Sequence, residues 1–355
     1  MPVYSINPNP VYIQDKIKDE INSVIESGSF VSGNKVRAFE DAFAAYCGKS
    51  YTVCVNSGTS ALHLALLISG IGEGDEVITV PNTFVATAEA ISYTGAKPVF
   101  VDIDINTYNI DTKKIVAVIT AKTKAILPVH LFGQPANMAR ICEIAEKHRL
   151  KIIEDCCQAH GATYGGKKVP YSGTGCFSFY PSKNLGAFGE GGAIVTDNKE
   201  IAEKARSLRD HGQTKKGVHE YIGFNYRMDE FQGVVLGIKL KHLRKWNFRR
   251  KVIAIEYNRL LEDIVITPEV FHVNHQYIIR TPRRDELLAH LRSKDITVGI
   301  HYPIPIHLQD AYDGKEGDFP VAEEVAGSMI SLPIQPEMTM AQVAFVAEAI
   351  KDFLS

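Results

Sequence analysis

The sequence predicts an α/β fold: a mixed, mostly parallel sheet flanked by helices, with a smaller C-terminal α+β unit. Short apolar runs alternate with helical patterns over the first two thirds of the chain. Strands separated by helices of about 10–15 residues are typical of a parallel sheet covered on both faces. The last third mixes helices and strands. Because chains of 355 residues usually divide, we expect a large domain over residues 1–245 and a small one over 246–355.

The first expected element is an amphipathic helix, because apolar residues three or four apart share one helix face. They are Ile13, Ile17, Ile21, Val24 and Ile25. Strands of one sheet follow, and the patterns after the first two predict helices from about Thr59 and from near Thr83. In chain order the strands are "YTVCV" (51–55), "EVITV" (76–80), "AKPVFVDI" (96–103), "TKAILPV" (123–129), "LKIIED" (150–155), "TGCFSFY" (174–180) and "GGAIVTD" (191–197). Little sequence separates the last two, so one of them could run antiparallel.

A basic helical stretch from about Met228 to Leu260 leads into the C-terminal unit. There we expect a strand at "HQYIIR" (275–280), a helix near 284–293, a further apolar segment at "DITVGI" (295–300) and a terminal helix over 339–353. These elements predict a small α+β domain.

Charge and composition exclude several classes of protein. The 39 basic and 41 acidic residues give a formal charge of −2, so no basic surplus indicates nucleic-acid binding. The N-terminus lacks the pattern of a signal peptide, and no apolar run reaches the roughly 18 residues of a membrane span. The six cysteines show no CxxC spacing, which favours reduced, mostly buried thiols. We therefore expect a cytoplasmic protein.

The segment "VNSGTSALHLAL" (55–66) passes from a strand end into a helix start. Its Ser57, Gly58, Thr59 and Ser60 would place backbone N–H groups and hydroxyls at a helix N-terminus. Unpaired donors and the positive end of the helix dipole hold a phosphate well at such a position. The segment matches neither GxxxxGK[ST] nor GxGxxG. An ordinary N-cap, which also favours Ser and Thr, explains the same residues.

The segment "IIEDCCQAHG" (152–161) places Glu154 and Asp155 at the end of a predicted buried strand. Ligand sites of parallel sheets gather at this edge. One carboxylate there could keep a proton on a heterocyclic ring nitrogen, and Gln158 could reach another ring substituent. A solvated strand end is the alternative. His160 has no partner at ligand spacing, so we expect a packed histidine and no metal site.

Lys183 lies in "FSFYPSKNLGAFGEGGAIV" (177–195), among aromatic residues and glycines. If this lysine is buried, desolvation lowers the pKa of its amine and frees it as a nucleophile toward carbonyls. The glycines would let the backbone approach a flat ligand closely. Taken alone, the residue could equally be a surface charge.

Together the three motifs match the needs of pyridoxal 5'-phosphate (PLP). The phosphate of PLP needs an anchor, its pyridinium nitrogen needs an anion, and its aldehyde needs an amine. A candidate anchor at the helix start, the strand-end acid Asp155 and Lys183, which follows that acid by 28 residues, could supply them.

The sequence resembles the sugar aminotransferases of the DegT/DnrJ/EryC1/StrS family over essentially its whole length. The resemblance extends through "SGSFVSGNKVRAFEDAFAAYCG", "VPNTFVATAEAI", "PVHLFGQPANM" and "GFNYRMDEFQG" to "VGIHYPIPIHLQ", besides the three segments above. It implies an aspartate-aminotransferase-like (type I) fold and a homodimer with shared active sites. It also implies nucleotide-linked keto sugars as substrates and L-glutamate as amino donor.

Carried over to this chain, the resemblance implies that Lys183 forms the Schiff base with PLP and moves protons as base and acid. Asp155 would pair with the pyridinium nitrogen. Some relatives carry histidine in place of the lysine and act as dehydratases, so Lys183 indicates transamination. The residues Cys157 and Gly233 are slightly unusual for the family, without an evident functional consequence.

The resemblance also implies the remaining cofactor contacts. Gln158 would donate to the phenolic oxygen of the ring, and Phe84 would stack on the ring face. His160 would be a further pocket residue without an assigned contact. The phosphate ligands would be Gly58, Thr59 and Ser178 of one chain and Asn225 of the partner chain.

The segment "VGIHYPIPIHLQDAY" (298–312) is most similar to members that aminate C3 of dTDP-3-keto-6-deoxyhexoses. The product would be a dTDP-3-amino-3,6-dideoxyhexose for glycan or antibiotic sugar biosynthesis. Amination of a 4-keto sugar on dTDP or UDP, and C3 amination of a UDP-N-acetyl-3-keto sugar, stay open. A catalytically silent, PLP-binding regulator is the non-enzyme alternative. A nicotinamide-dependent oxidoreductase is disfavoured, because no GxGxxG follows a strand.

Overall fold

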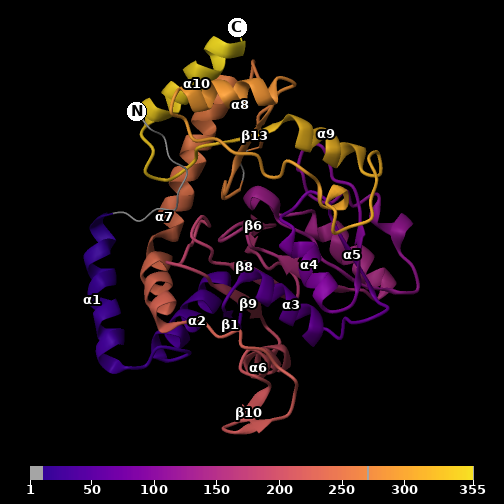
Figure 1. Cartoon of the computed structure of the whole chain (residues 1–355), viewed down its shortest axis with the longest axis vertical. Helices are drawn as coiled ribbons and strands as arrows, with labels where there is room; N and C mark the ends of the chain where they lie inside the picture. Colours follow the sequence, from indigo (N-terminus) through magenta and orange to yellow (C-terminus); the bar gives the residue numbers. More distant parts are fainter. Residues whose placement is uncertain (1–10, 270–271, 355) are drawn as a thin grey trace.

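Seven strands form the central sheet in the order β1-β9-β8-β5-β4-β2-β3 (Figure 1). The computed structural model describes residues 11–269 and 272–354. The strands are β1 (Tyr51–Val55), β2 (Glu76–Thr79), β3 (Lys97–Phe100), β4 (Thr123–Ile126), β5 (Lys151–Asp155), β8 (Thr174–Ser178) and β9 (Gly192–Thr196). β9 is antiparallel to both of its neighbours, and the other neighbouring pairs are parallel. The predicted fold class, including one antiparallel strand, is confirmed.

Helices cover both faces of this sheet, and the alternation of side chains along β1 shows how. Val53 and Val55 pack into the core beneath α3 (Gly58–Ile68), whereas Cys54 packs with Phe39 and Phe43 of α2 (Asn34–Cys47). Successive residues of a strand point to opposite faces, so each face has its own apolar layer. The helices of this part are α2 (Asn34–Cys47), α3 (Gly58–Ile68), α4 (Ala86–Tyr93), α5 (Met138–His148) and α6 (Lys199–Leu208), with 3₁₀ turns η1 (Ile115–Val118) and η2 (Leu131–Gly133).

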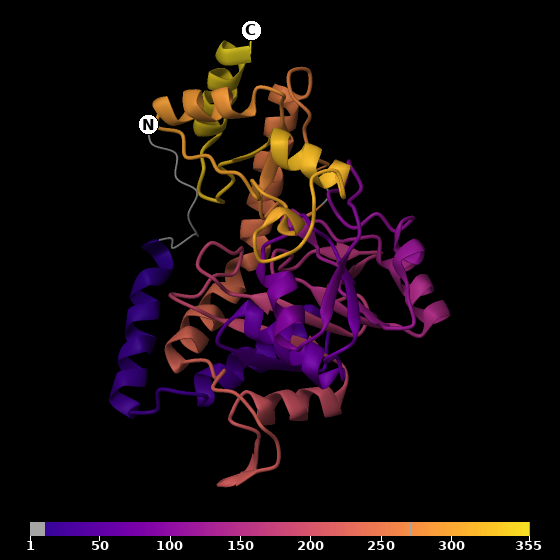
Figure 2. The same ribbon diagram turned by 45° about the vertical axis from the view of Figure 1, so that its right-hand side comes forward.

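The long helix α7 (Glu230–Leu261) runs from the sheet into the C-terminal unit (Figures 1 and 2). That unit has its own apolar core, to which the last turns of α7 contribute. Its elements are the antiparallel pair β12 (Tyr277–Arg280) and β13 (Met329–Leu332), the helices α8 (Arg284–Ser293), α9 (Pro320–Ser328) and α10 (Met340–Leu354), and the 3₁₀ turn η3 (Ile306–Leu308). The predicted domain boundary at residue 245 falls inside α7 and stays a prediction.

Two outlying elements extend from the large unit. Helix α1 (Val11–Ser27) packs on α7 through Ile13, Ile17 and Val24, whereas Ile25, expected on the same face, is 55% exposed. The hairpin of β10 (Gln213–Lys215) and β11 (Val218–His219) projects at the opposite end from the C-terminal helices (Figures 1 and 2). A second small hairpin consists of β6 (Thr163–Tyr164) and β7 (Lys167–Lys168).

Two predicted elements differ from the structure. The segment at 295–300 forms isolated bridges rather than a strand, and Gly299 pairs with Ser331 in one of them. The helix expected from near Thr83 begins at Ala86.

The unusual Gly233 has a packing reason. A Cβ at this position would lie 2.6 Å from the backbone nitrogen of Val36, so the glycine permits close contact between α7 and α2.

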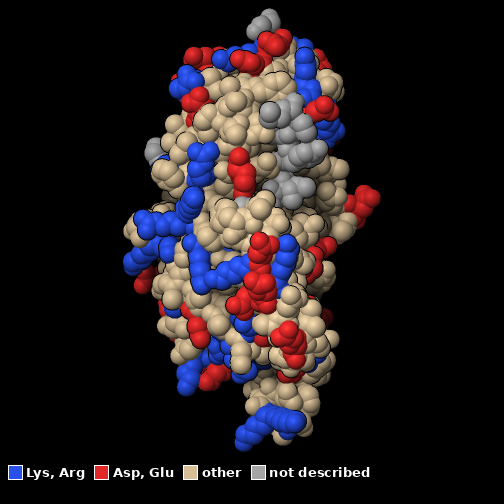
Figure 3. All heavy atoms as spheres, turned by 90° about the vertical axis from the view of Figure 1, so that its left-hand side faces the viewer, with Lys and Arg blue, Asp and Glu red and all other residues tan. Residues whose placement is uncertain are grey.

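The face that carries α1 has Lys and Arg side chains lying among Asp and Glu side chains (Figure 3). Lys18 pairs with Asp15 at 3.1 Å and Lys35 with Glu20 at 2.6 Å. Within the part of the chain that the structure describes, no helix is both long and apolar enough to span a bilayer.

Candidate active site

The candidate site lies where the parallel strands of the sheet end. Asp155 is the last residue of β5, Ser178 is the last residue of β8, and Gly58 begins α3 shortly after β1. Phe84 lies in the connection between β2 and α4. Because neighbouring parallel strands end at one edge, the sheet brings together residues that are distant in sequence. Lys183 follows β8 after a short loop.

The Asp155 carboxylate is buried and anchored through both oxygens. The Thr87 hydroxyl donates to Oδ2 at 2.8 Å, and the Cys157 N–H donates to Oδ1 at 3.1 Å. The hydroxyls of Thr83 and Thr87 lie 3.0 Å apart. Because a carboxylate has about four acceptor positions, Asp155 can still accept from a protonated ring nitrogen. Sequence reasoning missed Thr87, whose only signal is its four-residue spacing from Thr83.

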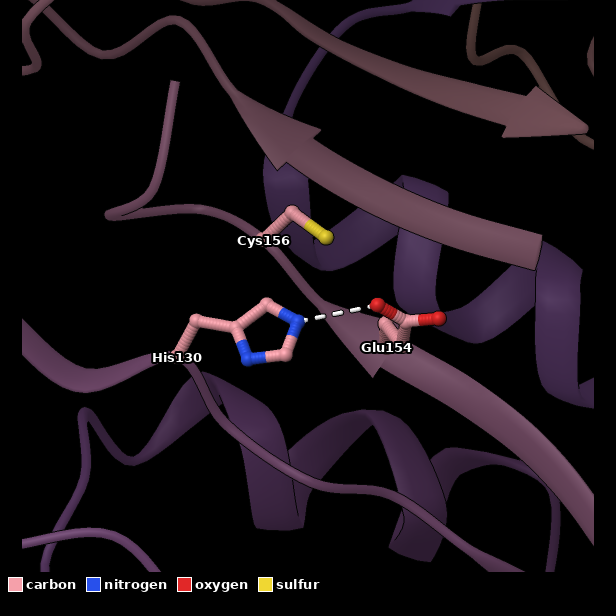
Figure 4. Close-up of side chains that lie close together, drawn as sticks. All are labelled: His130, Glu154 and Cys156. Atoms are coloured by element: carbon pink, nitrogen blue, oxygen red, sulfur yellow. Dashed lines mark hydrogen bonds and ion pairs between the residues drawn. The ribbon is translucent and has the colours of Figure 1, made fainter. Parts of the chain in front are cut away.

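Glu154, the neighbouring acid, has a different set of partners (Figure 4). Its oxygens accept from the N–H groups of Tyr171 at 2.8 Å and Ser172 at 2.6 Å, and its Oε2 lies 3.0 Å from Nε2 of His130. Nδ1 of His130 accepts from the N–H of Ala136 at 3.1 Å. Nε2 therefore carries the proton and donates to Glu154.

His130, Glu154 and Cys156 have the composition of a metal site, and their ligand atoms lie within 4.8 Å of one another. Both nitrogens of His130 and both oxygens of Glu154, however, already take part in hydrogen bonds. Burial, followed by the nearby carboxylates, raises the pKa of the Cys156 thiol well above its usual range. The cluster therefore suits a structural link between β5 and the loop at 170–172.

Lys183 is half-buried in the loop that joins β8 to β9. Burial lowers the pKa of its amine, and the nearby side chains of Cys157 and Asp155 oppose that shift. Because burial raises the pKa of Cys157 well above its usual range, its thiol is neutral at pH 7, and Asp155 is the anion that acts on Lys183. A lysine with a lowered pKa has more free amine at neutral pH, which is the nucleophilic form.

Helix α7 holds the Lys183 loop from one side. The N–H of Phe188 donates to Oε1 of Gln232 at 2.9 Å, and Nε2 of Gln232 donates back to the Phe188 carbonyl at 3.2 Å. Seven residues further along α7, Nζ of the fully buried Lys239 donates to the Gly186 carbonyl at 2.9 Å. Residues seven apart share one helix face. Sequence reasoning missed both α7 side chains, because nothing local links them to the loop.

The start of α3 and the end of β8 form a small cradle. Ser57 caps the helix by accepting from the N–H of Ser60 at 3.0 Å, as the N-cap interpretation predicts. The N–H groups of Gly58 and Thr59 lie in the first turn, where a helix offers them no partner. A Cβ on Gly58 would lie 2.7 Å from Cβ of Ser178. Backbone donors, a helix N-terminus and the Ser178 hydroxyl therefore meet at one place, which suits a phosphate.

Gln158 is buried with a defined amide orientation. Its Oε1 accepts from the N–H of Phe132 at 2.7 Å, and its Nε2 donates to the hydroxyl of Tyr302 at 3.2 Å. The ring of Tyr302 lies 5.8 Å from the ring of Phe84, which is 54% exposed. The amide donor of Gln158 therefore faces the same region as the exposed Phe84 ring. Tyr302 was not singled out in the sequence, although the segment that contains it was.

Two further sequence candidates lie apart from this cradle. His160 is buried against Phe177 and Phe179, and burial, with the charge of Lys183, lowers its pKa to about 3. It is therefore neutral at pH 7. Asn225 is exposed, and its side-chain oxygen accepts from Nη2 of Arg227 at 2.7 Å within the same chain.

The described residues fit PLP by their chemistry. The cradle at Gly58 and Ser178 suits the phosphate, and the carboxylate of Asp155 suits a protonated ring nitrogen. The half-buried amine of Lys183 suits an aldehyde carbon, because its lowered pKa leaves more of it unprotonated. Phe84 offers an open aromatic face.

Similarity to known proteins extends over the whole chain. The family model of the DegT/DnrJ/EryC1/StrS aminotransferase family matches residues 11–351. A dTDP-3-amino-3,6-dideoxy-alpha-D-galactopyranose transaminase from Aneurinibacillus thermoaerophilus is 45% identical, over 96% of both chains. A UDP-N-acetyl-3-dehydro-alpha-D-glucosamine 3-aminotransferase from Acidithiobacillus ferrooxidans is 42% identical, over 99% of this chain and 97% of its own. A protein named pleiotropic regulatory protein, from Geobacillus stearothermophilus, is 44% identical, over 99% and 98%.

Among solved structures, DesV of S. venezuelae in complex with a ketimine intermediate superposes with a TM-score of 0.97. The two chains are 41% identical, and the match covers 100% of this chain and 99% of the other. The chain therefore belongs to the DegT/DnrJ/EryC1/StrS aminotransferase family and is a PLP-dependent aminotransferase.

Proposed function

We propose that this chain transfers the amino group of L-glutamate to C3 of a nucleotide-linked keto sugar, with a dTDP-3-keto-6-deoxyhexose as its preferred acceptor. The product is then a dTDP-3-amino-3,6-dideoxyhexose. The observation that carries the proposal concerns Lys183, which is half-buried. Burial lowers the pKa of its amine, and the charge of Asp155 acts on that amine. An aminotransferase needs this combination of nucleophile and anion.

Each residue has a defined task in this proposal. PLP, when bound, supplies an electron sink that makes a neighbouring C–H bond acidic. Asp155 keeps the proton on the ring nitrogen, and Thr87 and the Cys157 N–H hold the Asp155 carboxylate in place. Lys183 acts as nucleophile and then moves a proton as base and acid through Nζ.

The remaining contacts position the cofactor. The N–H groups of Gly58 and Thr59, with the Ser178 hydroxyl, would hold the phosphate. Gln158 would donate to the ring oxygen, because its Oε1 is already fixed by Phe132. Phe84 would cover one face of the ring.

The choice of C3 is supported by the names of two relatives. Both the Aneurinibacillus and the Acidithiobacillus proteins are named for amino sugars substituted at C3, one on dTDP and the other on UDP. The choice of dTDP over UDP has only the likeness of the 298–312 segment behind it. The 4-keto acceptors and the UDP-N-acetyl-3-keto sugars are therefore the alternatives to test.

We further propose that the enzyme works as a cytoplasmic homodimer with shared active sites. Large apolar side chains lie exposed near the β10–β11 hairpin, where Ile222 is 95% exposed and Val218 47% exposed, and a second copy would cover them. The six cysteines are all free thiols, as in a reducing compartment.

The deciding experiment offers the purified protein L-glutamate and a panel of nucleotide-linked sugars. The panel crosses 3-keto with 4-keto sugars and dTDP with UDP, and mass spectrometry reads the amino sugar formed. Preferred turnover of the dTDP-3-keto sugar supports the proposal, and preference for any other member replaces it.

A regulator is favoured by one relative, the pleiotropic regulatory protein. A silent regulator would bind PLP without converting it when L-glutamate is added, which the visible absorbance of the cofactor reveals. Conversion by L-glutamate would contradict a silent role.

A further inference from the structure

A cavity of about 210 Å³ lies next to the Lys183 loop, between that loop and the C-terminal unit. Its wall includes Ser182, Arg250, Gln276, His301, Ser331 and Gln335. One water needs about 10–15 Å³ of such space, so the cavity has room for part of a small organic molecule. Ser182 precedes Lys183 directly, and the charge of Lys183 acts on His301. The cavity is therefore a neighbour of the candidate site.

Arg250 is the unusual member of this wall. Its side chain projects from α7 and is 4% exposed, and its Nη1 donates to the Ile334 carbonyl at 2.9 Å. Its Nε is buried and has no hydrogen-bond partner among the described residues. A buried guanidinium donor without a partner costs free energy, so natural proteins rarely leave one unused. Burial lowers the pKa of Arg250 to about 10, with Glu337 opposing the shift, so the group is still a cation at pH 7.

The other described groups of the wall leave this charge unpaired within the cavity. Burial, followed by the charge of Lys183, lowers the pKa of His301 to about 4, so it is neutral at pH 7. Burial also lowers the pKa of His275 well below its usual range. None of the described lining residues is Asp or Glu. Glu337, which acts on Arg250 electrostatically, is an exposed residue outside the wall.

A buried cation beside neutral hydrogen-bonding side chains is suited to a small anion. The guanidinium fork matches a carboxylate, which accepts two parallel N–H bonds. An α-amino acid that donates its amino group in the site of Lys183 carries a carboxylate on the carbon next to that amine. We propose that this cavity is the carboxylate subsite for the amino donor and that Arg250 is its cationic anchor. The inference rests on the proposed donor, L-glutamate, and assigns the element that recognises it.

The chain provides a matched control for this proposal. Arg249, the neighbour of Arg250, donates to the Met338 carbonyl at 3.0 Å, and Arg250 donates to Ile334, so both arginines hold the 334–338 segment. Only Arg250 is among the described lining residues. If both arginines only anchor this segment, Arg249→Met and Arg250→Met should weaken anion binding alike. If Arg250 binds the anion, only Arg250→Met should weaken it.

The test uses the full-length PLP-loaded protein and isothermal titration with glutarate, a dicarboxylate that has no amine and cannot react. We expect wild type to bind glutarate and to ignore glutaramide, its uncharged analogue. Arg250→Met should weaken glutarate binding at least tenfold, which corresponds to about 1.4 kcal/mol of binding free energy. Arg250→Lys should recover part of this affinity. Arg249→Met should bind glutarate within about twofold of wild type. Equal affinity in all four proteins, or equal loss in both methionine variants, overturns the proposal.

Stopped-flow measurement of the two half-reactions provides a second readout. The concentration of L-glutamate needed for half-maximal conversion should rise in Arg250→Met, while the limiting rate and the reaction with the keto sugar change little. If Arg250→Met fails to fold, Gln276→Leu, which alters another wall residue, should weaken glutarate binding several-fold, and no change in it counts against the subsite. Glutarate binding is measured without a sugar. A failed sugar panel would therefore overturn the proposed function, while the glutarate titration would still decide whether the subsite exists.

Discussion

Asp155 and Glu154 are neighbours on β5, yet their carboxylates enter separate hydrogen-bond networks. Asp155 accepts from Thr87 and faces the Lys183 side, whereas Glu154 links His130 to the loop at 170–172. Asp155→Asn should lower the rate of amino transfer by orders of magnitude with little loss of stability, because the ring nitrogen would lose its anion. Glu154→Gln should keep most of the rate but lower the free energy of unfolding by about 1.5–3 kcal/mol, the scale of a charged hydrogen bond.

Steady-state kinetics and thermal unfolding of both variants check this separation of roles. A near-normal rate in Asp155→Asn, together with a collapsed rate in Glu154→Gln, would show that Glu154, and not Asp155, has the electronic role.

Lys183 carries the second prediction at this scale. Lys183→Ala should abolish turnover, because the nucleophile and the proton carrier are the same amine. PLP should still bind through the phosphate cradle at Gly58 and Ser178. Product formation is measured by mass spectrometry with protein purified away from wild type. Lys199→Ala, which removes an exposed lysine of α6 paired with Glu203, is the control and should be fully active. Sustained turnover by Lys183→Ala contradicts the assignment.

Among the elements, α7 does more than the sequence pattern predicted. Its position and length could be read from the sequence, and "YTVCV" matches β1 to the residue, because local apolar spacing determines these features. The clamp of Gln232 and Lys239 on the Lys183 loop could not be read, since it depends on contacts between residues over 40 positions apart. The same holds for the support of Asp155 by Thr87, 68 positions away. The segment at 295–300 has the composition of a strand but finds only isolated bridges.

Two glycines of α7 provide a matched test of its packing. A Cβ at Gly233 would meet the backbone of Val36 at 2.6 Å, whereas a Cβ at Gly237 would meet nothing within 4 Å. Gly237→Ala should stabilise the protein by about 0.5–1 kcal/mol, since alanine favours the helix. Gly233→Ala should destabilise it by about 1–3 kcal/mol, because backbone must move to admit the methyl group. Urea denaturation measures both, and an equal gain in the two variants would refute the close contact of α7 with α2.

Lys239 predicts a pH dependence of stability. Burial lowers its pKa to about 8, whereas the unfolded chain should titrate near 10.4. Between these values the unfolded state binds more protons, so the free energy of unfolding of wild type should rise with pH relative to Lys239→Met. The slope of the difference is at most about 1.4 kcal/mol per pH unit, and it should vanish below about pH 8, where both states are protonated.

Urea denaturation of both proteins from pH 7 to pH 10.5 gives this difference directly. A flat difference across the whole range would mean that the Lys239 ammonium is not buried as the structure has it.

At the scale of the whole molecule, we propose that each active site borrows Asn225 from the partner chain. Within one chain Asn225 is exposed, and Arg227 bonds its side-chain oxygen, so its amide N–H groups are directed away from that contact. Contacts across a two-fold axis occur twice per dimer. Lys183→Ala and Asn225→Ala should therefore each be impaired as homodimers, the second mainly in its affinity for PLP.

A mixed dimer of these two variants has one site that collects both defects and one site that collects neither. Mixing Lys183→Ala with Asn225→Ala under conditions of subunit exchange, at limiting PLP, should therefore restore activity to as much as half of the wild-type value per mixed dimer. The same mixture without exchange is the control, and differently tagged chains prove that mixed dimers form. Recovery cannot arise if Asn225 serves the site of its own chain, because the Lys183→Ala chain would then lack its amine and the other chain its phosphate ligand. Absence of recovery despite proven exchange therefore places Asn225 in its own chain's site or outside the site.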